Sequence, residues 1–414
     1  MLKLPEQVRR IWTGCLRAAT AAFTLVIVAM PFVLATRSAH AQSFTVLYTF
    51  NGVDGANPYA GLIRDKAGNL YGTTLNGGRL GAGNVFKLDT GSMFTTLYTF
   101  TGRPGDGTQP YGTLLRDQAG NLYGTTALGI GARFIHGIVY RIGTTGKEAK
   151  PHLFAGPPAD GSNPVAGLIR DKAGNLYGTT GGGGSACSTG GQNGCGIVFK
   201  LNNGKETVLY NFTGSANGDG AAPEGVLVRD KAGNLYGTTL SGGNDNAPLG
   251  IVFRLDITGK ETILHLFSGG SDGGGPAAGL VLDQGGNLYG TTTGQTVFKI
   301  DTSGNNYSVL YTFSGGADGS EPYAPVVMDK AGNLYGTTKY GGNLSCNAGL
   351  GCGVVFKLNT AGKETVLHTF SGGTDGALPV AGLLRDSAGN LYGTTLQGGT
   401  GCANGCGVIF KIHP

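Results

Sequence analysis

Gly68-Asn69-Leu70-Tyr71-Gly72-Thr73-Thr74 is a segment that this chain of 414 residues contains seven times. The spacing between consecutive copies ranges from 46 to 59 residues, and the copies begin at Gly68, Gly120, Gly174, Gly233, Gly286, Gly332 and Gly389. Periods of this size are typical of propellers, solenoids and arrays. Repetition therefore overrides the two or three domains that the length alone suggests.

Each repeat contains four short runs rich in Val, Ile, Tyr and Phe and bounded by Gly and Asp. In the first repeat, the runs A, B, C and D are Ala60–Asp65, Asn69–Thr74, Asn84–Leu88 and Thr95–Phe100. Such runs predict strands, and four strands in about 50 residues are what a propeller blade needs. The sequence predicts an all-β fold, in which residues 42–414 form a single seven-bladed β-propeller.

The two ends of the repeat array are complementary. Residues 44–50 resemble a D strand that no blade precedes, whereas Gly407–Ile412 is a C strand that no D strand follows. Pairing these two strands would close the ring and remove an exposed sheet edge. We expect the N-terminal strand to complete the last blade.

Residues that recur in every blade have simple structural interpretations. A glycine inside a strand, such as Gly72, is unfavourable unless a neighbour needs the space, and we expect an aromatic side chain of the neighbouring blade to pack over it. The turn between strands A and B is Asp-x-x-Gly in all copies, with Asp65 and Gly68 in the first. Asp there caps the turn, and Gly takes a positive φ.

Residues 1–41 have the pattern of a secretory signal sequence. Four basic residues precede an apolar run over residues 18–35, and Ala39-His40-Ala41 matches a small-x-small cleavage site. An uncleaved anchor is the alternative, since the run is near the lower limit for spanning a bilayer. We expect cleavage before Gln42, no membrane span afterwards, and a secreted or periplasmic monomer.

The net charge of +5 comes mostly from this leader. Its five basic residues and one acidic residue, taken from totals of 30 and 25, leave 25 and 24, a net charge of +1. No basic field remains that would attract nucleic acid. Nucleic acid is therefore not an expected partner.

The cysteines agree with export. Outside the leader they form three close pairs on Gly-rich loops, namely Cys187 with Cys195, Cys346 with Cys352, and Cys402 with Cys406. Local disulfides in an oxidising compartment are the simplest interpretation. A metal site is the rival, but no His or Asp flanks the pairs and they belong to different repeats, so we expect no metal there.

The unit Asp-x-x-Gly-Asn-Leu-Tyr-Gly-Thr-Thr, followed by Gly-Val-Val-Phe-Lys-Leu, closely resembles the bacterial tandem repeat called GloVer, over nearly all of residues 42–414. Strands A and B are more remotely similar to NHL and gluconolactonase-like propellers. The resemblance to GloVer implies an exported, often surface-displayed protein. It brings no catalytic residues to this chain.

The loops between strands D and A contain Asp-Gly-x-x-Pro seven times, from Asp54-to-Pro58 through Asp375-to-Pro379. A ring of seven carboxylates could bind Ca²⁺. In the alternative, Asp bonds nearby amides and Pro directs the chain into strand A. Sevenfold recurrence favours this turn, because a scaffold repeats whereas a site breaks the symmetry; we expect no cofactor.

Residues beside these prolines do break the symmetry, and they lead into the innermost strands at the channel mouth. Tyr with Asn, Gln and Glu there could stack on sugar rings and bond hydroxyl groups. The candidate ligand-binding residues are Tyr59, Tyr111, Glu224 and Tyr323 after the proline, and Asn57, Gln109, Asn163 and Glu321 before it. Glu224 and Glu321 would be an acid/base pair if they came near each other.

Three functions stay open. The leading hypothesis is a binding module for a carbohydrate or for an envelope or extracellular protein. The second is a propeller hydrolase or lyase of lactonase-like or glycan-cleaving type, although no catalytic motif is present. The third is a structural surface protein without a small ligand. His152, His265 and His368 replace the Tyr of strand D, which we interpret as amphipathic packing.

Overall fold

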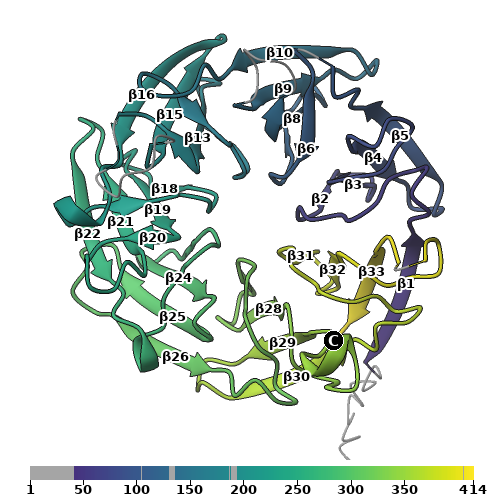
Figure 1. Cartoon of the computed structure of the whole chain (residues 1–414). Coiled ribbons are helices and arrows are strands. Elements are labelled where there is room, and N and C mark those ends of the chain that lie inside the picture. Colours follow the sequence, from purple (N-terminus) through teal and green to yellow (C-terminus); the bar gives the residue numbers. More distant parts are fainter. Residues whose placement is uncertain (1–41, 104, 130–135, 186, 188–193, 404) are drawn as a thin grey trace, which may run out of the picture. The chain divides into compact units, whose positions relative to one another are not determined.

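The computed structural model describes residues 42–414 except 104, 130–135, 186, 188–193 and 404. The predicted signal sequence, residues 1–41, lies outside the described residues. Residues 42–414 form an all-β ring of seven four-stranded antiparallel blades around a central channel (Figure 1). The predicted seven-bladed β-propeller is confirmed. Within the described part of the chain, no helix is long and apolar enough to cross a membrane.

Strands A to D of each blade run from the channel outward. Blades 1 and 2 contain β2 (Ile63–Arg64), β3 (Leu70–Thr74), β4 (Asn84–Leu88), β5 (Phe94–Thr99), β7 (Leu115–Arg116), β8 (Leu122–Gly129), β9 (Ile138–Ile142) and β10 (Glu148–Leu153). Blades 3 and 4 contain β12 (Ile169–Arg170), β13 (Leu176–Thr180), β15 (Ile197–Asn202), β16 (Lys205–Asn211), β18 (Val228–Arg229), β19 (Leu235–Thr239), β21 (Ile251–Leu255) and β22 (Glu261–Leu266).

The last three blades repeat this order. Blades 5 to 7 contain β23 (Val281–Leu282), β24 (Asn287–Thr292), β25 (Thr296–Asp301), β26 (Ser308–Thr312), β27 (Val327–Met328), β28 (Leu334–Thr338), β29 (Val354–Leu358), β30 (Glu364–Thr369), β31 (Leu384–Arg385), β32 (Leu391–Thr394), β33 (Val408–His413) and β1 (Ser43–Thr49). The loops add short pieces, namely β6 (Gly107–Pro110), β11 (Gly161–Ser162), β14 (Gly182–Gly183), β17 (Gly220–Ala221), β20 (Ser241–Gly242) and the 3₁₀ turns Ser215–Asn217, Gly270–Asp272 and Asn347–Gly349.

Strand A is shorter than predicted. In blade 1, only Ile63–Arg64 pair with β3, whereas the sequence predicts a strand over Ala60–Asp65. The carbonyl groups of the residues before strand A instead accept hydrogen bonds from the preceding blade. For example, the Thr125 hydroxyl of blade 2 donates to the Ala166 carbonyl of blade 3 at 2.9 Å. Each of the seven blades makes such a bond with the next. The first threonine of Gly-Thr-Thr therefore links the blades.

The mid-strand glycine accommodates an aromatic ring, but the ring belongs to the same blade. A Cβ on Gly72 would lie 2.6 Å from Phe86 of β4 and 2.9 Å from Leu62, both in blade 1. The expectation that the ring comes from the neighbouring blade is wrong, because Gly72 and Phe86 are directly paired across the B and C strands.

The N-terminal strand closes the ring. In Figure 1, β1 lies beside β33, the last strand of the chain, and their register runs from Ser43 opposite His413 to Thr49 opposite Val408. Phe50, the residue after β1, is fully buried. The predicted completion of blade 7 is confirmed.

Strand D contacts both neighbouring blades because it contains a β-bulge. In β1 the register shifts between Val46 and Tyr48, so Leu47 is the extra residue. Residues 44 and 48 would share a face in a regular strand, but the bulge puts them on opposite faces. Phe44 consequently stacks on His368 of blade 6, and Tyr48 stacks on Phe94 of blade 1.

Candidate functional site

The seven Asp-Gly-x-x-Pro carboxylates bond to their own turns. Asp219, for example, accepts the Thr213 amide at 2.8 Å and the Tyr210 hydroxyl at 3.1 Å. A Tyr or His of strand D lies within 3.5 Å of each of these aspartates. These contacts agree with the turn interpretation, and they explain why Tyr and His interchange in strand D: both reach the same carboxylate.

The residue before each proline is held in a left-handed conformation. Its φ lies between 51° and 65° in all seven blades, at Asn57, Gln109, Asn163, Ala222, Gly275, Glu321 and Leu378. The shared role of this position is thus in the backbone. Asn57 also uses its side chain within the protein, since its amide donates to the Leu396 carbonyl at 2.8 Å and accepts from Asn76 at 3.2 Å.

The residue after the proline points into the channel, and three tyrosines meet there. The ring centroid of Tyr59 lies 4.2 Å from that of Tyr111 and 6.1 Å from that of Tyr323. Burial raises the pKa of Tyr59 strongly, and its neighbours Tyr323 and Tyr111 raise it further. The three candidate tyrosines of blades 1, 2 and 6 therefore form one cluster.

Glu224 of blade 4 belongs to the same mouth. Burial raises the pKa of its carboxyl group, and its charge acts on both Tyr111 and Tyr323. We call the set Tyr59, Tyr111, Tyr323 and Glu224 the tyrosine mouth. The cavity between these residues is small, about 90 Å³, which equals the share of about three waters in the liquid.

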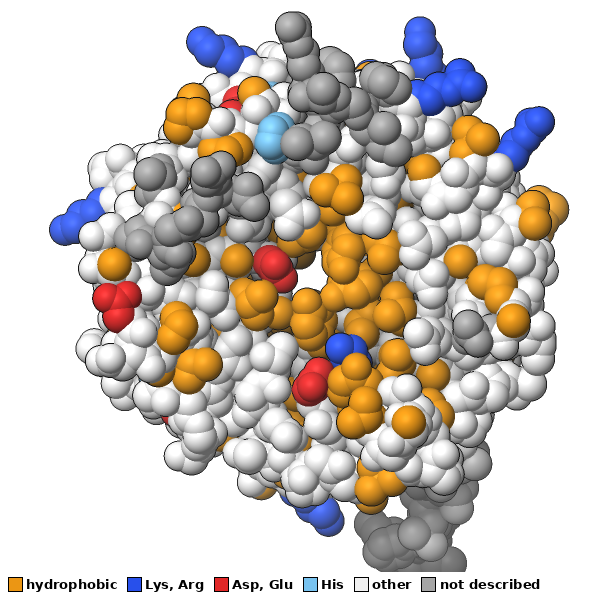
Figure 2. Space-filling model, viewed as in Figure 1, with side chains coloured by type: hydrophobic (Ala, Val, Ile, Leu, Met, Phe, Trp, Pro, Cys, Tyr) orange, Lys and Arg blue, Asp and Glu red, His pale blue; other side chains and the backbone are white. Residues whose placement is uncertain are grey.

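Lys339 borders the tyrosine mouth, and the sequence analysis did not predict it there. Its Nζ lies 3.7 Å from Glu321 Oε2, 4.6 Å from the centroid of Tyr340 and 5.9 Å from that of Tyr323. The signal was available, because Lys339 follows Gly-Thr-Thr where the other blades have Leu75, Ala127, Gly181, Leu240, Thr293 and Leu396. Figure 2 shows acidic and basic side chains next to the apolar ring around the central opening.

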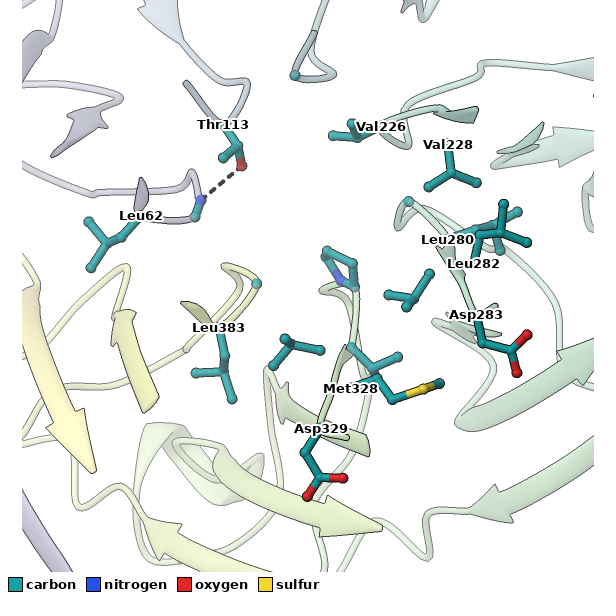
Figure 3. A pocket seen from close by; sticks show the side chains of 18 of the residues that line it. Leu62, Thr113, Val226, Val228, Leu280, Leu282, Asp283, Met328, Asp329 and Leu383 are labelled. Atoms are coloured by element: carbon teal, nitrogen blue, oxygen red, sulfur yellow. Dashed lines mark hydrogen bonds between the residues drawn. The ribbon is translucent and has the colours of Figure 1, made fainter. Parts of the chain in front are cut away.

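The channel widens toward the opposite face, where the A–B turns lie. A cavity of about 1020 Å³ opens there, and its lining includes Leu62, Val226, Leu280, Leu282, Met328 and Leu383. Figure 3 shows these apolar side chains around it, with Asp283 and Asp329 farther from the centre. Gly61, Thr113 and Val226 line this cavity and the tyrosine mouth alike, so both belong to one channel.

Two blades lack an arginine at the rim of this cavity, and the residues that replace it line the cavity. Five blades have Arg before the Asp of the A–B turn. Four of these arginines lie over a Tyr ring of the preceding blade, as Arg116 does over Tyr71 at 5.7 Å. Blades 5 and 6 have Leu282 and Met328 there. The absence of Arg before the Asp in these two blades was visible in the sequence, but the site was predicted on the other face of the ring.

Three disulfides hold the loops on the tyrosine-mouth face. They join Cys187 to Cys195, Cys346 to Cys352, and Cys402 to Cys406, with Cα–Cα distances of 5.1, 5.7 and 5.6 Å. These are the pairs that the sequence predicts. Each crosslinks a B–C loop to itself, so the disulfides stiffen the loops around the mouth.

The sequence matches one family model along the repeat array. The model of the Gloeobacter/Verrucomicrobia repeat covers residues 34–187, 185–296 and 294–414. No curated protein matches the sequence significantly.

Solved structures share the fold at low sequence identity. Virginiamycin B lyase from Staphylococcus aureus superposes with a TM-score of 0.60 at 13% identity, covering 90% of this chain and 99% of that chain. Oligogalacturonate lyase from Vibrio parahaemolyticus has a TM-score of 0.55 at 12% identity, covering 91% and 94%. A gluconolactonase from Xanthomonas campestris reaches 0.44 at 13%, covering 90% and 89%. At such identities, the first two similarities show the fold alone, and the third carries no argument.

Proposed function

The chain belongs to the Gloeobacter/Verrucomicrobia repeat family, and from this premise we propose that it is an exported binding module that holds a carbohydrate at the tyrosine mouth. The observation that carries the proposal is the meeting of Tyr59, Tyr111 and Tyr323 with Glu224 at the mouth. These residues occupy equivalent positions that differ between blades. A rigid repeated scaffold that presents non-repeated residues is the usual arrangement of a binding site.

The chemistry of the mouth suits a sugar. A sugar ring has apolar C–H faces and polar hydroxyl edges, so it binds where aromatic surface and a few hydrogen-bonding groups converge. The tyrosines supply the aromatic surface, and Glu224, Glu321 and Lys339 supply hydrogen-bonding groups. Because the space between the tyrosines is only about 90 Å³, the sugar would rest on the outer side of the cluster.

The predicted export of residues 42–414 favours a carbohydrate or another envelope component as ligand. The predicted cleavage before Gln42 leaves the closing strand intact, because β1 begins at Ser43. The three disulfides suit an oxidising compartment. Polysaccharides are abundant in such a compartment.

The test is a thermal-melt and titration panel of soluble oligosaccharides with residues 42–414. Tyr111→Val removes one ring but keeps a residue found at this position in blades 3 and 7. We expect one sugar class to raise the melting temperature of the wild type and to bind the variant at least tenfold more weakly. Val380→Ala, which introduces the residue of blade 5, is the matched control and should bind normally.

Two results would argue against carbohydrate binding. The first is the absence of a melting shift with every oligosaccharide at millimolar concentration. The second is equal affinity of the wild type and Tyr111→Val for a sugar that does bind. The first result would favour a protein partner or a structural role.

A hydrolase or lyase at the same mouth is the second candidate. The observation that favours it is the contrast between two carboxyl groups: burial raises the pKa of Glu224, whereas Glu321 lies 3.7 Å from the Lys339 ammonium. Carboxyl groups in such different surroundings can divide the acid and base roles. Turnover of a bound glycan or lactone that survives in the double variant Glu224→Gln, Glu321→Gln would remove this mechanism.

A further inference from the structure

Seven equivalent joints connect the outer strands of neighbouring blades. Each joint is formed by two residues. One is the strand D Tyr or His that bonds the turn aspartate of its own blade. The other belongs to strand D of the next blade and lies four positions before the Tyr or His of that strand. In the joint between blades 7 and 1, Tyr48 meets Phe94, and Tyr48 also donates to Asp54. The bulge in strand D makes this possible, since it points the two positions toward opposite neighbours.

The joints differ in what they combine. Aromatic stacks form three of them, with centroids 4.3 Å apart in Tyr48–Phe94, 3.6 Å in His265–Tyr307 and 3.7 Å in His368–Phe44. Three others pair a tyrosine with a glutamate, namely Tyr98–Glu148, Tyr210–Glu261 and Tyr311–Glu364. The joint between blades 2 and 3 differs from all six, because it combines a histidine with a glutamate.

This joint brings three metal-ligating groups together. His152 Nε2 lies 3.5 Å from Asp160 Oδ2 and 3.3 Å from Glu206 Oε2, and the three ligand atoms all lie within 4.8 Å of one another. Tetrahedral zinc with bonds of 2.0–2.2 Å to nitrogen and oxygen has ligand–ligand distances of about 3.3–3.6 Å. Both distances from the imidazole nitrogen have this length.

The polar atoms of the joint are buried and incompletely bonded. The side chains of His152, Asp160 and Glu206 are 14%, 12% and 13% exposed. His152 Nε2 and Glu206 Oε1 have no hydrogen-bond partner within the described part of the chain. Buried polar atoms in that state are costly, and an ion between the three side chains would bond the imidazole nitrogen.

We propose that His152, Asp160 and Glu206 bind one divalent transition-metal ion of the zinc class, which ties blade 2 to blade 3. Two carboxylates balance the charge of the ion, and one imidazole with carboxylate oxygens is a ligand set that zinc accepts. A water completes the tetrahedron. Asp160 is held in place by backbone amides, since Ala155 and Gly161 each donate to its carboxylate at 2.6 Å.

The experiment measures zinc in residues 42–414 after the purification tag has been removed. Protein stripped with a chelator is dialysed against micromolar Zn²⁺, and its metal content, melting temperature and Co²⁺ absorption spectrum are recorded. We expect one ion per chain, a higher melting temperature with zinc, and the visible absorption of tetrahedral Co²⁺.

The repeat supplies matched variants. His152→Tyr introduces the residue of Tyr48, Tyr98, Tyr210 and Tyr311, so the blade should fold, but zinc affinity should fall at least tenfold. His265→Tyr makes the same change at a joint without glutamate and should leave zinc binding unchanged. Glu206→Gln removes one carboxylate ligand and should weaken zinc binding at least tenfold.

Two outcomes would overturn the proposal. The first is wild-type protein that binds no zinc even when Zn²⁺ is raised to 0.1 mM. The second is zinc that binds equally to the wild type and to folded His152→Tyr, which would place the ion elsewhere. Sugar binding at the tyrosine mouth is a separate measurement that neither outcome decides.

Discussion

Replacing Phe50 by Ala tests whether the N-terminal strand holds the ring as firmly as an internal strand does. Phe50 follows β1, is fully buried, and contacts Phe86 of blade 1 with ring centroids 5.4 Å apart. Phe212 is its equivalent after β16, is equally buried, and lies 5.1 Å from Phe253 of blade 4. Phe212→Ala is therefore the matched control, because it follows a strand D that is continuous in sequence with the rest of its blade.

The expected magnitude follows from burial. Truncating a buried Phe to Ala costs about 3–5 kcal/mol. Unfolding entropy is about 2.1 cal/mol/K per residue near 60 °C, which gives about 0.8 kcal/mol/K for the roughly 370 residues after the leader. Dividing the two gives a decrease in melting temperature of about 4–6 °C for both variants.

The assay is calorimetry of the oxidised wild type and both variants in one buffer. If the closing strand is docked as firmly as an internal strand, Phe50→Ala and Phe212→Ala lose the same amount within error. A decrease of about 1 °C or less for Phe50→Ala, the range of a surface substitution, beside the full decrease for Phe212→Ala would refute the closure.

Three further predictions concern a hydrogen bond between blades, a loop disulfide and the dependence of stability on pH. Thr238→Val removes the hydroxyl that donates to the Ala278 carbonyl at 2.8 Å and should cost about 1–3 kcal/mol in denaturant titrations, whereas Thr207→Val on the exposed side should cost almost nothing. Cys402→Ser with Cys406→Ser opens a short loop and should cost roughly 2 kcal/mol, while removing any effect of a reductant on that loop. Burial and the charge of Asp219 raise the pKa of Glu261 to about 7, so the folded state retains a proton that the unfolded chain loses near pH 4. The stability that this group contributes is present at low pH and is lost as the pH rises through 7. The melting temperature of Glu261→Gln relative to the wild type should therefore increase between pH 5 and pH 8. A relative decrease over this range would contradict the raised pKa of Glu261.

Seven nearly identical segments were enough to predict the number of blades and the strand order. Strand C of blade 1 lies over Asn84–Leu88, as predicted, because alternating apolar residues determine a half-buried strand well. Strand A was predicted too long, because its backbone bonds go to another blade, and no periodicity within one repeat records them. The partner of Gly72 was assigned to the wrong blade for a related reason: a mid-strand glycine predicts a close neighbour but not the chain segment that supplies it.

The candidate site could be predicted in part. The position after each proline correctly selected the residues of the inner ring, and the tyrosines among them cluster. The positions beside the prolines do not predict Lys339, because it directly follows the repeated segment in the next part of the blade. The wide mouth was missed because the site was predicted on the face with the longer loops, whereas this cavity is lined by the inner strands and by short A–B turns.

The joint between blades 2 and 3 shows why single departures from a repeat are insufficient. His occurs in three joints and Glu in four, so neither residue is unusual alone. They meet only where His152 faces Glu206, and their meeting depends on a bulge that turns two positions of one strand toward different blades. Comparing such pairs requires knowing which positions of consecutive repeats are in contact. In a closed ring of repeats, the residue pairs most worth testing are therefore those that occur at one joint only, since the needs of the scaffold explain the pairs that recur.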